Sequence, residues 1–166
     1  DTPVFFCAVS APTAAGILTD MDKPDKNATG TSNAIPVSKI IDLAQATTPV
    51  KKIGLIYSGN EDNATNTVKQ CEEYLKSINV EYVEKTAASS NDVETATNAL
   101  IAEGAEAIFV PNDSIIQDGV SKLTEICNEK KIPTYCSSAT TVASGCFATL
   151  AIDDKGIGKK TVDIAM

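Results

Sequence analysis

The sequence predicts an α/β fold in which helices join the strands of a parallel sheet. The first observation is a set of short apolar runs that recur at intervals of about 25 to 30 residues. The second is that amphipathic helical patterns fill these intervals, and the third is that a polar turn follows each run. This alternation is typical of a parallel sheet with right-handed crossovers, in which ligands bind beyond the carboxyl ends of the strands.

Residues 51–77 form the clearest of these units. Ile53, Leu55 and Ile56 make an apolar run without a polar face, which is typical of a strand covered by helices on both sides. Asp62 or Asn63 can cap the helix that follows. The inward stripe of this helix is expected to be Val68, Cys71, Leu75 and Ile78.

Upstream of this unit, residues 4–9 are interpreted as a buried strand. Residues 13–19 favour a short helix, and residues 21–32 a polar loop. A further helix is expected over residues 36–46, and Pro49 marks a hinge after it. Its inward stripe is Val37, Ile40, Ile41 and Ala44.

Downstream, the pattern predicts four more strands, at residues 80–83, 107–110, 132–136 and 146–152. Asn91 and Glu94 resemble a capping box for a helix that ends at Gly104. The next helix carries one inward apolar stripe. A final helix over residues 153–166 begins with two carboxylates, whose negative charge suits the positive N-terminal end of the helix dipole. The single stripe consists of Ile116, Val120, Leu123 and Cys127.

Composition excludes several classes of function. The 166 residues carry a formal charge of −8, which opposes binding to nucleic acid or to an anionic membrane. The chain has no histidine, so histidine triads and histidine metal sites are excluded. Its five cysteines form no CxxC pair and are interpreted as buried thiols. No phosphate loop or GxGxxG motif occurs, and no cofactor is predicted.

Six segments of the chain resemble the ABC-transporter substrate-binding proteins related to tryptophan and aromatic amino-acid receptors. They occur in the order and spacing of that family: PVFFCAVSAPTAAGIL, NATGTS, KKIGLIYSGNEDNA, AIFVPNDS, IPTYCSSATTVASG and ATLAIDDKGIGKKTVDIA. The resemblance implies two Rossmann-like lobes of the type I periplasmic-binding fold. Residues 1–48 would be a partial lobe one, residues 49–145 a complete lobe two, and residues 146–166 a crossover strand and helix returning to lobe one. The chain is therefore expected to be a fragment that lacks the start of lobe one.

The resemblance also implies a function and a site. The chain would be the extracytoplasmic solute-binding component of an ABC importer, in the periplasm or anchored as a lipoprotein, that delivers an amino acid to permease subunits. The family's ligand-binding segments carry over onto Ser10, Thr31, Ser58, Glu61, Asn63, Asn112, Asp113, Ser137, Ser138 and Asp153. The chain departs from the family at Ala11, where members usually have an acidic residue.

The chemistry of a zwitterionic ligand supports this assignment. A buried ammonium group needs a carboxylate, which Asp113 or Asp153 could supply. A buried carboxylate needs hydroxyl or amide donors such as Ser58, Ser137 and Ser138. Each residue also has a structural interpretation, since Asp113 and Asp153 can cap helices and Ser137 and Ser138 can be a plain polar loop.

Three other classes of protein share this kind of sheet. An enzyme would need a nucleophile or phosphate loop at a strand exit, and a response-regulator receiver would need an acidic pair that the chain lacks. The stronger alternative is the effector-sensing domain of a transcription regulator. Exposed apolar residues around Val4 to Val9 also make a homodimer through the incomplete lobe plausible.

Overall fold

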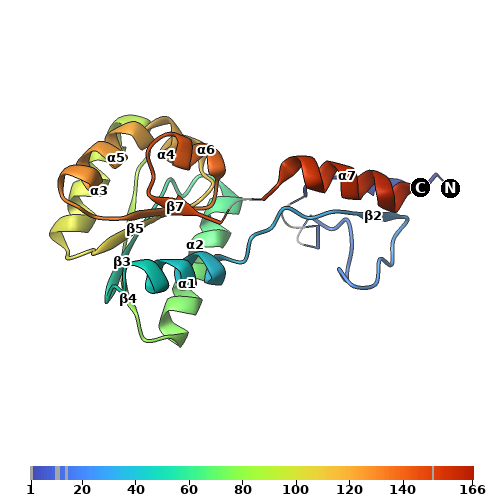
Figure 1. The fold of residues 1–166 in the computed structure, drawn as a ribbon, viewed down its shortest axis with the longest axis horizontal. Helices are drawn as coiled ribbons and strands as arrows, with labels where there is room; N and C mark the ends of the chain where they lie inside the picture. Colours follow the sequence, from blue (N-terminus) through green and yellow to red (C-terminus); the bar gives the residue numbers. More distant parts are fainter. Residues whose placement is uncertain (1, 10–11, 14, 151) are drawn as a thin grey trace. The chain divides into compact units, whose positions relative to one another are not determined.

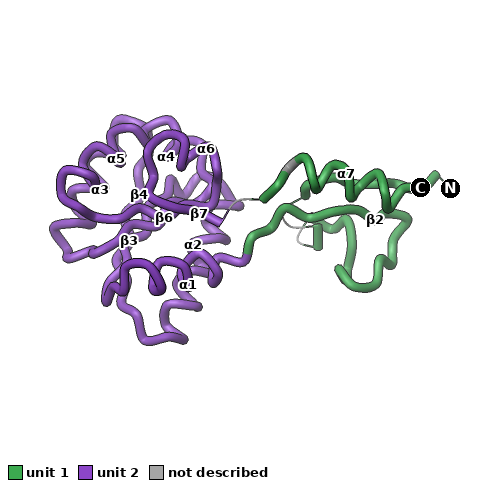
Figure 2. The backbone as a smooth tube through the Cα atoms, viewed as in Figure 1, with its two compact units in different colours: residues 1–35, 152–166 green, residues 36–151 purple. Residues whose placement is uncertain are grey.

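The computed structural model describes residues 2–9, 12–13, 15–150 and 152–166 (Figure 1). The chain divides into two compact units (Figure 2). Unit 1 comprises residues 1–35 and 152–166, and unit 2 comprises residues 36–151. These boundaries differ from those expected at residues 48 and 145, and the assignment of the units to two lobes stays a prediction.

Unit 2 contains a five-stranded sheet in the order β4-β3-β5-β6-β7, with every neighbouring pair parallel. The predicted fold class is therefore confirmed. The strands are β3 (Lys52–Tyr57), β4 (Glu81–Thr86), β5 (Ala107–Val110), β6 (Thr134–Cys136) and β7 (Ala148–Thr149). Strand β5 is buried along its whole length because helices cover both of its faces.

The helices of unit 2 form two layers. Helices α1 and α2 contact each other, as do α3 and α5 on the opposite side of the sheet (Figure 1). The elements are α1 (Val37–Thr47), α2 (Asp62–Ser77), the 3₁₀ helix η1 (Ser90–Asp92), α3 (Val93–Ala102), α4 (Ser114–Asp118), α5 (Val120–Glu129) and α6 (Ala139–Ala143). Because α2, α4 and α6 each follow a strand directly, their N-termini lie at the carboxyl edge of the sheet.

The apolar stripes of α1 and α2 follow the sequence pattern closely. All four residues predicted to face inward from α1 are buried. In α2 the stripe is correct up to Leu75, but Ile78 is 36% exposed because the helix ends at Ser77. The expected cap was also wrong, since Glu61 occupies the N-cap position of α2 and makes no side-chain hydrogen bond to the helix.

The single helix predicted after β5 is two helices, α4 and α5, which meet at Gly119. A Cβ atom at Gly119 would lie 2.7 Å from Cγ2 of Val93 and 2.8 Å from the carbonyl oxygen of Ser90. Glycine therefore permits the close approach of this junction to the start of α3. The four stripe residues are all buried, although they belong to two helices.

The capping box before α3 also lies two residues earlier than predicted. Ser89 and Asp92 form it, in place of Asn91 and Glu94. The backbone amide and the hydroxyl of Ser89 both donate to Oδ2 of Asp92, at 3.0 and 2.8 Å. As a result, a turn of 3₁₀ helix precedes α3. Gly104 ends the helix with a φ of 88°, as predicted from the sequence.

Unit 1 consists of β1 (Val4–Phe6), β2 (Ala28–Gly30) and α7 (Asp154–Ala165). Strand β1 pairs in parallel with β2, which the sequence analysis assigned to a polar loop. The strand predicted over residues 4–9 is present only over Val4–Phe6, and its predicted burial was wrong for two of the three residues, since Val4 is 55% and Phe5 40% exposed. The short helix expected after it is also wrong over its described residues, which form turns around Gly16.

Candidate ligand-binding site

In unit 2, the exits of β3 and β5 are joined through a buried carboxylate. The backbone amide and the hydroxyl of Ser58 each donate to Oδ2 of Asp113 at 2.8 Å. The other oxygen, Oδ1, accepts a bond of 3.2 Å from the amide of Ile116 and thereby caps α4. Asp113 is 0% exposed, and both of its oxygens have protein donors. These hydrogen bonds fix the position of the β3 exit relative to the β5 exit.

A second pair of contacts joins the same two exits nearer the surface. The carboxylate of Glu61 accepts from the amide of Ser114 at 2.9 Å and also from the Ser114 hydroxyl. The Asn63 side-chain amide donates to the carbonyl oxygen of Asn112 at 2.8 Å. The side chain of Asn112 accepts from Gln117. These side chains are at least partly exposed, so their remaining donors and acceptors can reach a ligand.

The exit of β6 carries Ser137 and Ser138, which are both half-buried. The Ser137 amide donates to the carbonyl oxygen of Val110 at 3.1 Å and continues the ladder with β5. Ser138 occupies the N-cap position of α6, but its hydroxyl bonds to Oγ1 of Thr140 at 2.6 Å and not to the helix amides. Hydroxyl groups thus lie at the edge where β5 and β6 end.

Unit 1 contains the other two described candidates, Thr31 and Asp153, and both line one open hollow of about 510 Å³. The Thr31 hydroxyl bonds to Oγ1 of Thr161 at 2.6 Å. Asp153 is exposed at the N-cap position of α7 and makes no side-chain hydrogen bond to the helix. The hollow is lined by Thr31, Ser32, Ile152, Asp153, Gly156, Ile157, Lys160 and Ile164.

Two polar residues of this hollow, Ser32 and Lys160, were not predicted from the sequence. Lys160 follows Asp153 by two helical turns, and Ile157 and Ile164 recur on the same side of α7. A search for one mixed polar and apolar face along this helix could have found Lys160. The lining thus offers a carboxylate, an ammonium group, hydroxyls and apolar side chains, which are the groups that an amphipathic zwitterion needs.

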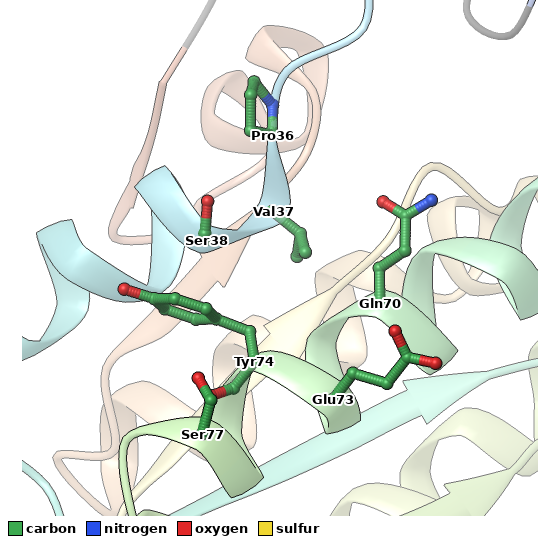
Figure 3. A pocket seen from close by; sticks show the side chains of 7 residues that line it. All are labelled: Pro36, Val37, Ser38, Gln70, Glu73, Tyr74 and Ser77. Atoms are coloured by element: carbon green, nitrogen blue, oxygen red, sulfur yellow. The ribbon is translucent and has the colours of Figure 1, made fainter.

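A further hollow of about 370 Å³ lies between α1 and α2 (Figure 3). It is lined by Pro36, Val37, Ser38, Gln70, Glu73, Tyr74 and Ser77. Tyr74 bonds through its hydroxyl to Asp42. The lining part of α2 is its second half, whereas the predicted ligand residues Glu61 and Asn63 lie at its start. This hollow contains none of the residues predicted to bind ligand.

The structure therefore brings together Ser58, Glu61, Asn63, Asn112 and Asp113 in unit 2, with Ser137 and Ser138 on the next strand exit. It brings together Thr31 and Asp153 in unit 1. Ser10, the remaining candidate, lies outside the described residues, as does Ala11. The roles of all these candidate residues in ligand binding stay predictions.

The open parallel sheet makes the chain an α/β protein, a class in which ligands bind beyond the carboxyl ends of the strands. More specifically, the chain belongs to the family of ABC transporter substrate binding proteins, whose sequence profile it matches over residues 1–166. This family is non-enzymatic, which agrees with the prediction that the chain is not an enzyme. Among the described residues, no helix is both long and apolar enough to cross a lipid bilayer.

Relatives support this membership along the whole chain. A tyrosine-binding protein of Clostridioides difficile (strain R20291) is 34% identical over 167 residues, which cover 100% of this chain and 48% of the relative. The ligand-free, open structure of a Clostridium difficile substrate binding protein with adhesive properties has a TM-score of 0.90 at 30% identity, covering 99% of this chain and 56% of that one.

A third relative is a domain from Streptococcus pneumonia, solved in complex with L-Trp. It has a TM-score of 0.77 at 29% identity, and the match covers 99% of this chain and 57% of that one. The chain thus spans about half the length of the relatives that it matches.

Proposed function

We propose that the chain is part of the extracytoplasmic solute-binding component of an ABC importer, and that it captures an amino acid, with aromatic side chains favoured. The observation that carries this proposal is the hollow of unit 1, whose lining includes Asp153, Lys160 and three isoleucines. Family membership supports the transport role. No observation favours the alternative of an effector-sensing domain of a regulator.

The groups of this hollow match the two charges of an amino acid. The Asp153 carboxylate pairs with the ligand ammonium group, and Lys160 with the ligand carboxylate. Thr31 and Ser32 add hydroxyl groups. Side-chain specificity arises from the apolar residues Ile152, Ile157 and Ile164, which can pack against an aromatic ring. Asp113 was the other candidate for the ammonium group, but both of its oxygens accept from protein donors, so Asp153 is the better placed.

The names of two relatives point to the same ligand class. One is a tyrosine-binding protein, and another was solved in complex with L-Trp. Extending an aromatic ligand to this chain is a proposal, supported by 34% and 29% identity along its length. The polar side chains at the exits of β3, β5 and β6 stay separate candidates for ligand contacts within unit 2.

Transport by such a protein requires capture and no covalent chemistry. A ligand held between two lobes favours the closed state through contacts that the open state lacks, and permease subunits recognise that shape. Unit 2 would correspond to one lobe and unit 1 to part of the other. The protein would work in the periplasm or as a lipoprotein at the cell surface, and the exposed Val4 and Phe5 would favour a homodimer.

A thermal-shift screen of the 166-residue chain tests the ligand class. It compares the amino acids with short peptides, sugars and nucleosides. Tyrosine or tryptophan at 100 times its dissociation constant is expected to stabilise the folded state by about 2.7 kcal/mol, or about 5 to 10 °C in Tm. A shift with sugars or nucleosides and none with amino acids would overturn the proposal, as would no shift with any compound.

A further inference from the structure

Helix α7 contains two glycines in its first half, Gly156 and Gly158. A glycine inside a helix lowers the stability of the helix relative to alanine, because glycine has more conformational freedom in the unfolded chain. Neither glycine has a positive φ, so the backbone conformation at these positions does not require glycine. A role for either glycine must therefore come from the space around it.

The space around the two glycines differs. A Cβ atom at Gly156 would lie 2.6 Å from Oδ2 and 3.1 Å from Cγ of Asp153, which is closer than the roughly 3.5 to 4.0 Å at which carbon atoms pack. A Cβ atom at Gly158 would meet no atom within 4 Å outside its own stretch of helix. The Asp153 carboxylate thus lies in the place that a side chain at residue 156 would occupy.

A Cβ atom at residue 156 would displace the carboxylate and not the helix. Further along α7, Thr161 is 8% exposed and its hydroxyl bonds to Oγ1 of Thr31 at 2.6 Å, which ties the helix to the segment that follows β2. Asp153, by contrast, is exposed and makes no side-chain hydrogen bond to the helix. Rotation of the Asp153 side chain to another rotamer therefore costs less than movement of α7.

Gly156 and Asp153 both line the hollow of unit 1. Gly156 lies on the same side of α7 as Lys160, which follows it by four residues and also lines the hollow. Because Gly156 has no side chain, the Asp153 carboxylate lies against the helix on the side that carries Lys160. A carboxylate that turned away into solvent would be lost to a ligand in the hollow.

We propose that Gly156 is a positioning residue of this ligand site. Its lack of a Cβ atom allows the Asp153 carboxylate to occupy the place from which it binds the ammonium group of an amino acid. The inference rests on the proposed function where it concerns the ligand. The position of the carboxylate itself can be measured without a ligand.

The first experiment therefore uses the ligand-free 166-residue chain. Three-bond couplings between the Hα and Hβ protons of Asp153, measured by NMR on isotope-labelled protein, report the rotamer of this side chain. Gly156→Ala should change these couplings, because the new methyl group excludes the carboxylate from its place. Gly158→Ala is the matched control and should leave them unchanged, since its Cβ atom would have open space.

Two results of this experiment would overturn the proposal. One is a set of Asp153 couplings that is the same in Gly156→Ala and in the wild type. The other is a loss of helical backbone chemical shifts along α7 in Gly156→Ala, because the helix and not the carboxylate would then have moved.

Calorimetric titration of L-tyrosine and L-tryptophan measures the consequence for binding. Gly156→Ala should weaken binding by about 10-fold, because the displaced carboxylate lies farther from the ligand ammonium group. Gly158→Ala should bind as the wild type does. Equal affinities for Gly156→Ala and a wild type that binds would contradict a positioning role.

A double-mutant cycle separates positioning from direct contact with the ligand. In an Asp153→Ala background, Gly156→Ala should have no further effect on affinity, because Gly156 acts through the carboxylate. A further loss of the same size would show that Gly156 makes room for the ligand itself, which would overturn the proposal. If the wild type binds neither amino acid, the proposed function fails, whereas the couplings still decide whether Gly156 positions Asp153.

Discussion

Replacing Asp113 with alanine is expected to lower the free energy of unfolding of unit 2 by about 3 to 5 kcal/mol. The substitution removes the cap of α4 and leaves three donors without an acceptor, namely the amide and hydroxyl of Ser58 and the amide of Ile116. Because the site is fully buried, water cannot replace the carboxylate without rearrangement. The loss combines that of a helix cap with that of unsatisfied buried groups.

Urea unfolding followed by far-UV circular dichroism measures this loss. Asp118→Ala is the matched control, since Asp118 is exposed on the same helix, and it should change stability by less than about 0.5 kcal/mol. Asp113→Asn keeps one oxygen acceptor, so its loss of stability should fall between those of Asp118→Ala and Asp113→Ala. A loss below about 1 kcal/mol for Asp113→Ala would show that the buried network does not join the two strand exits.

Replacing Asp153 with asparagine is expected to weaken binding of an aromatic amino acid by about 100-fold, which corresponds to about 2.7 kcal/mol. Asparagine has the same shape and caps helices as well as aspartate, so α7 should keep its stability. It lacks the negative charge that the ligand ammonium group requires once the site closes around it. Affinity should therefore fall while the fold is unchanged.

Asp163→Asn provides the matched control for charge. Asp163 is exposed on the same helix but does not line the hollow, so its loss should leave affinity within about twofold, as expected when only screened long-range charge is removed. Equal affinities for wild type and Asp153→Asn would mean that another carboxylate holds the ammonium group. The partly exposed Glu61 would then be the first to substitute.

The buried strands and the stripe of α1 could be predicted because the apolar pattern there has a single interpretation. Strand β3 has an apolar run without a polar face, and α1 has a regular stripe. The break at Gly119 could not be predicted, since the groups that leave no room for a Cβ atom there belong to Ser90 and Val93, which are distant in sequence. The exposure of Val4 and Phe5 in β1 could not be predicted either. An apolar run shows that a strand can be buried, but burial also requires another element that packs against it.

Part of the candidate site could likewise be predicted from the sequence, and part could not. Because parallel strands end at a common edge, the polar turns predicted after the strands were expected at that edge, and there Ser58 and Asp113 bond to each other. It could not decide whether Asp113 serves the ligand or the fold, since a cap and an ammonium partner need the same carboxylate. Lys160 was missed because it lies inside a helix, away from any strand exit.

The most direct test of the central claim, that this chain binds an aromatic amino acid, is calorimetric titration of L-tyrosine and L-tryptophan into the 166-residue chain. We expect saturable heat at one ligand per chain for at least one of them, and no heat for glucose or a nucleoside. Saturable heat from glucose or the nucleoside, with none from either amino acid, would contradict the claim.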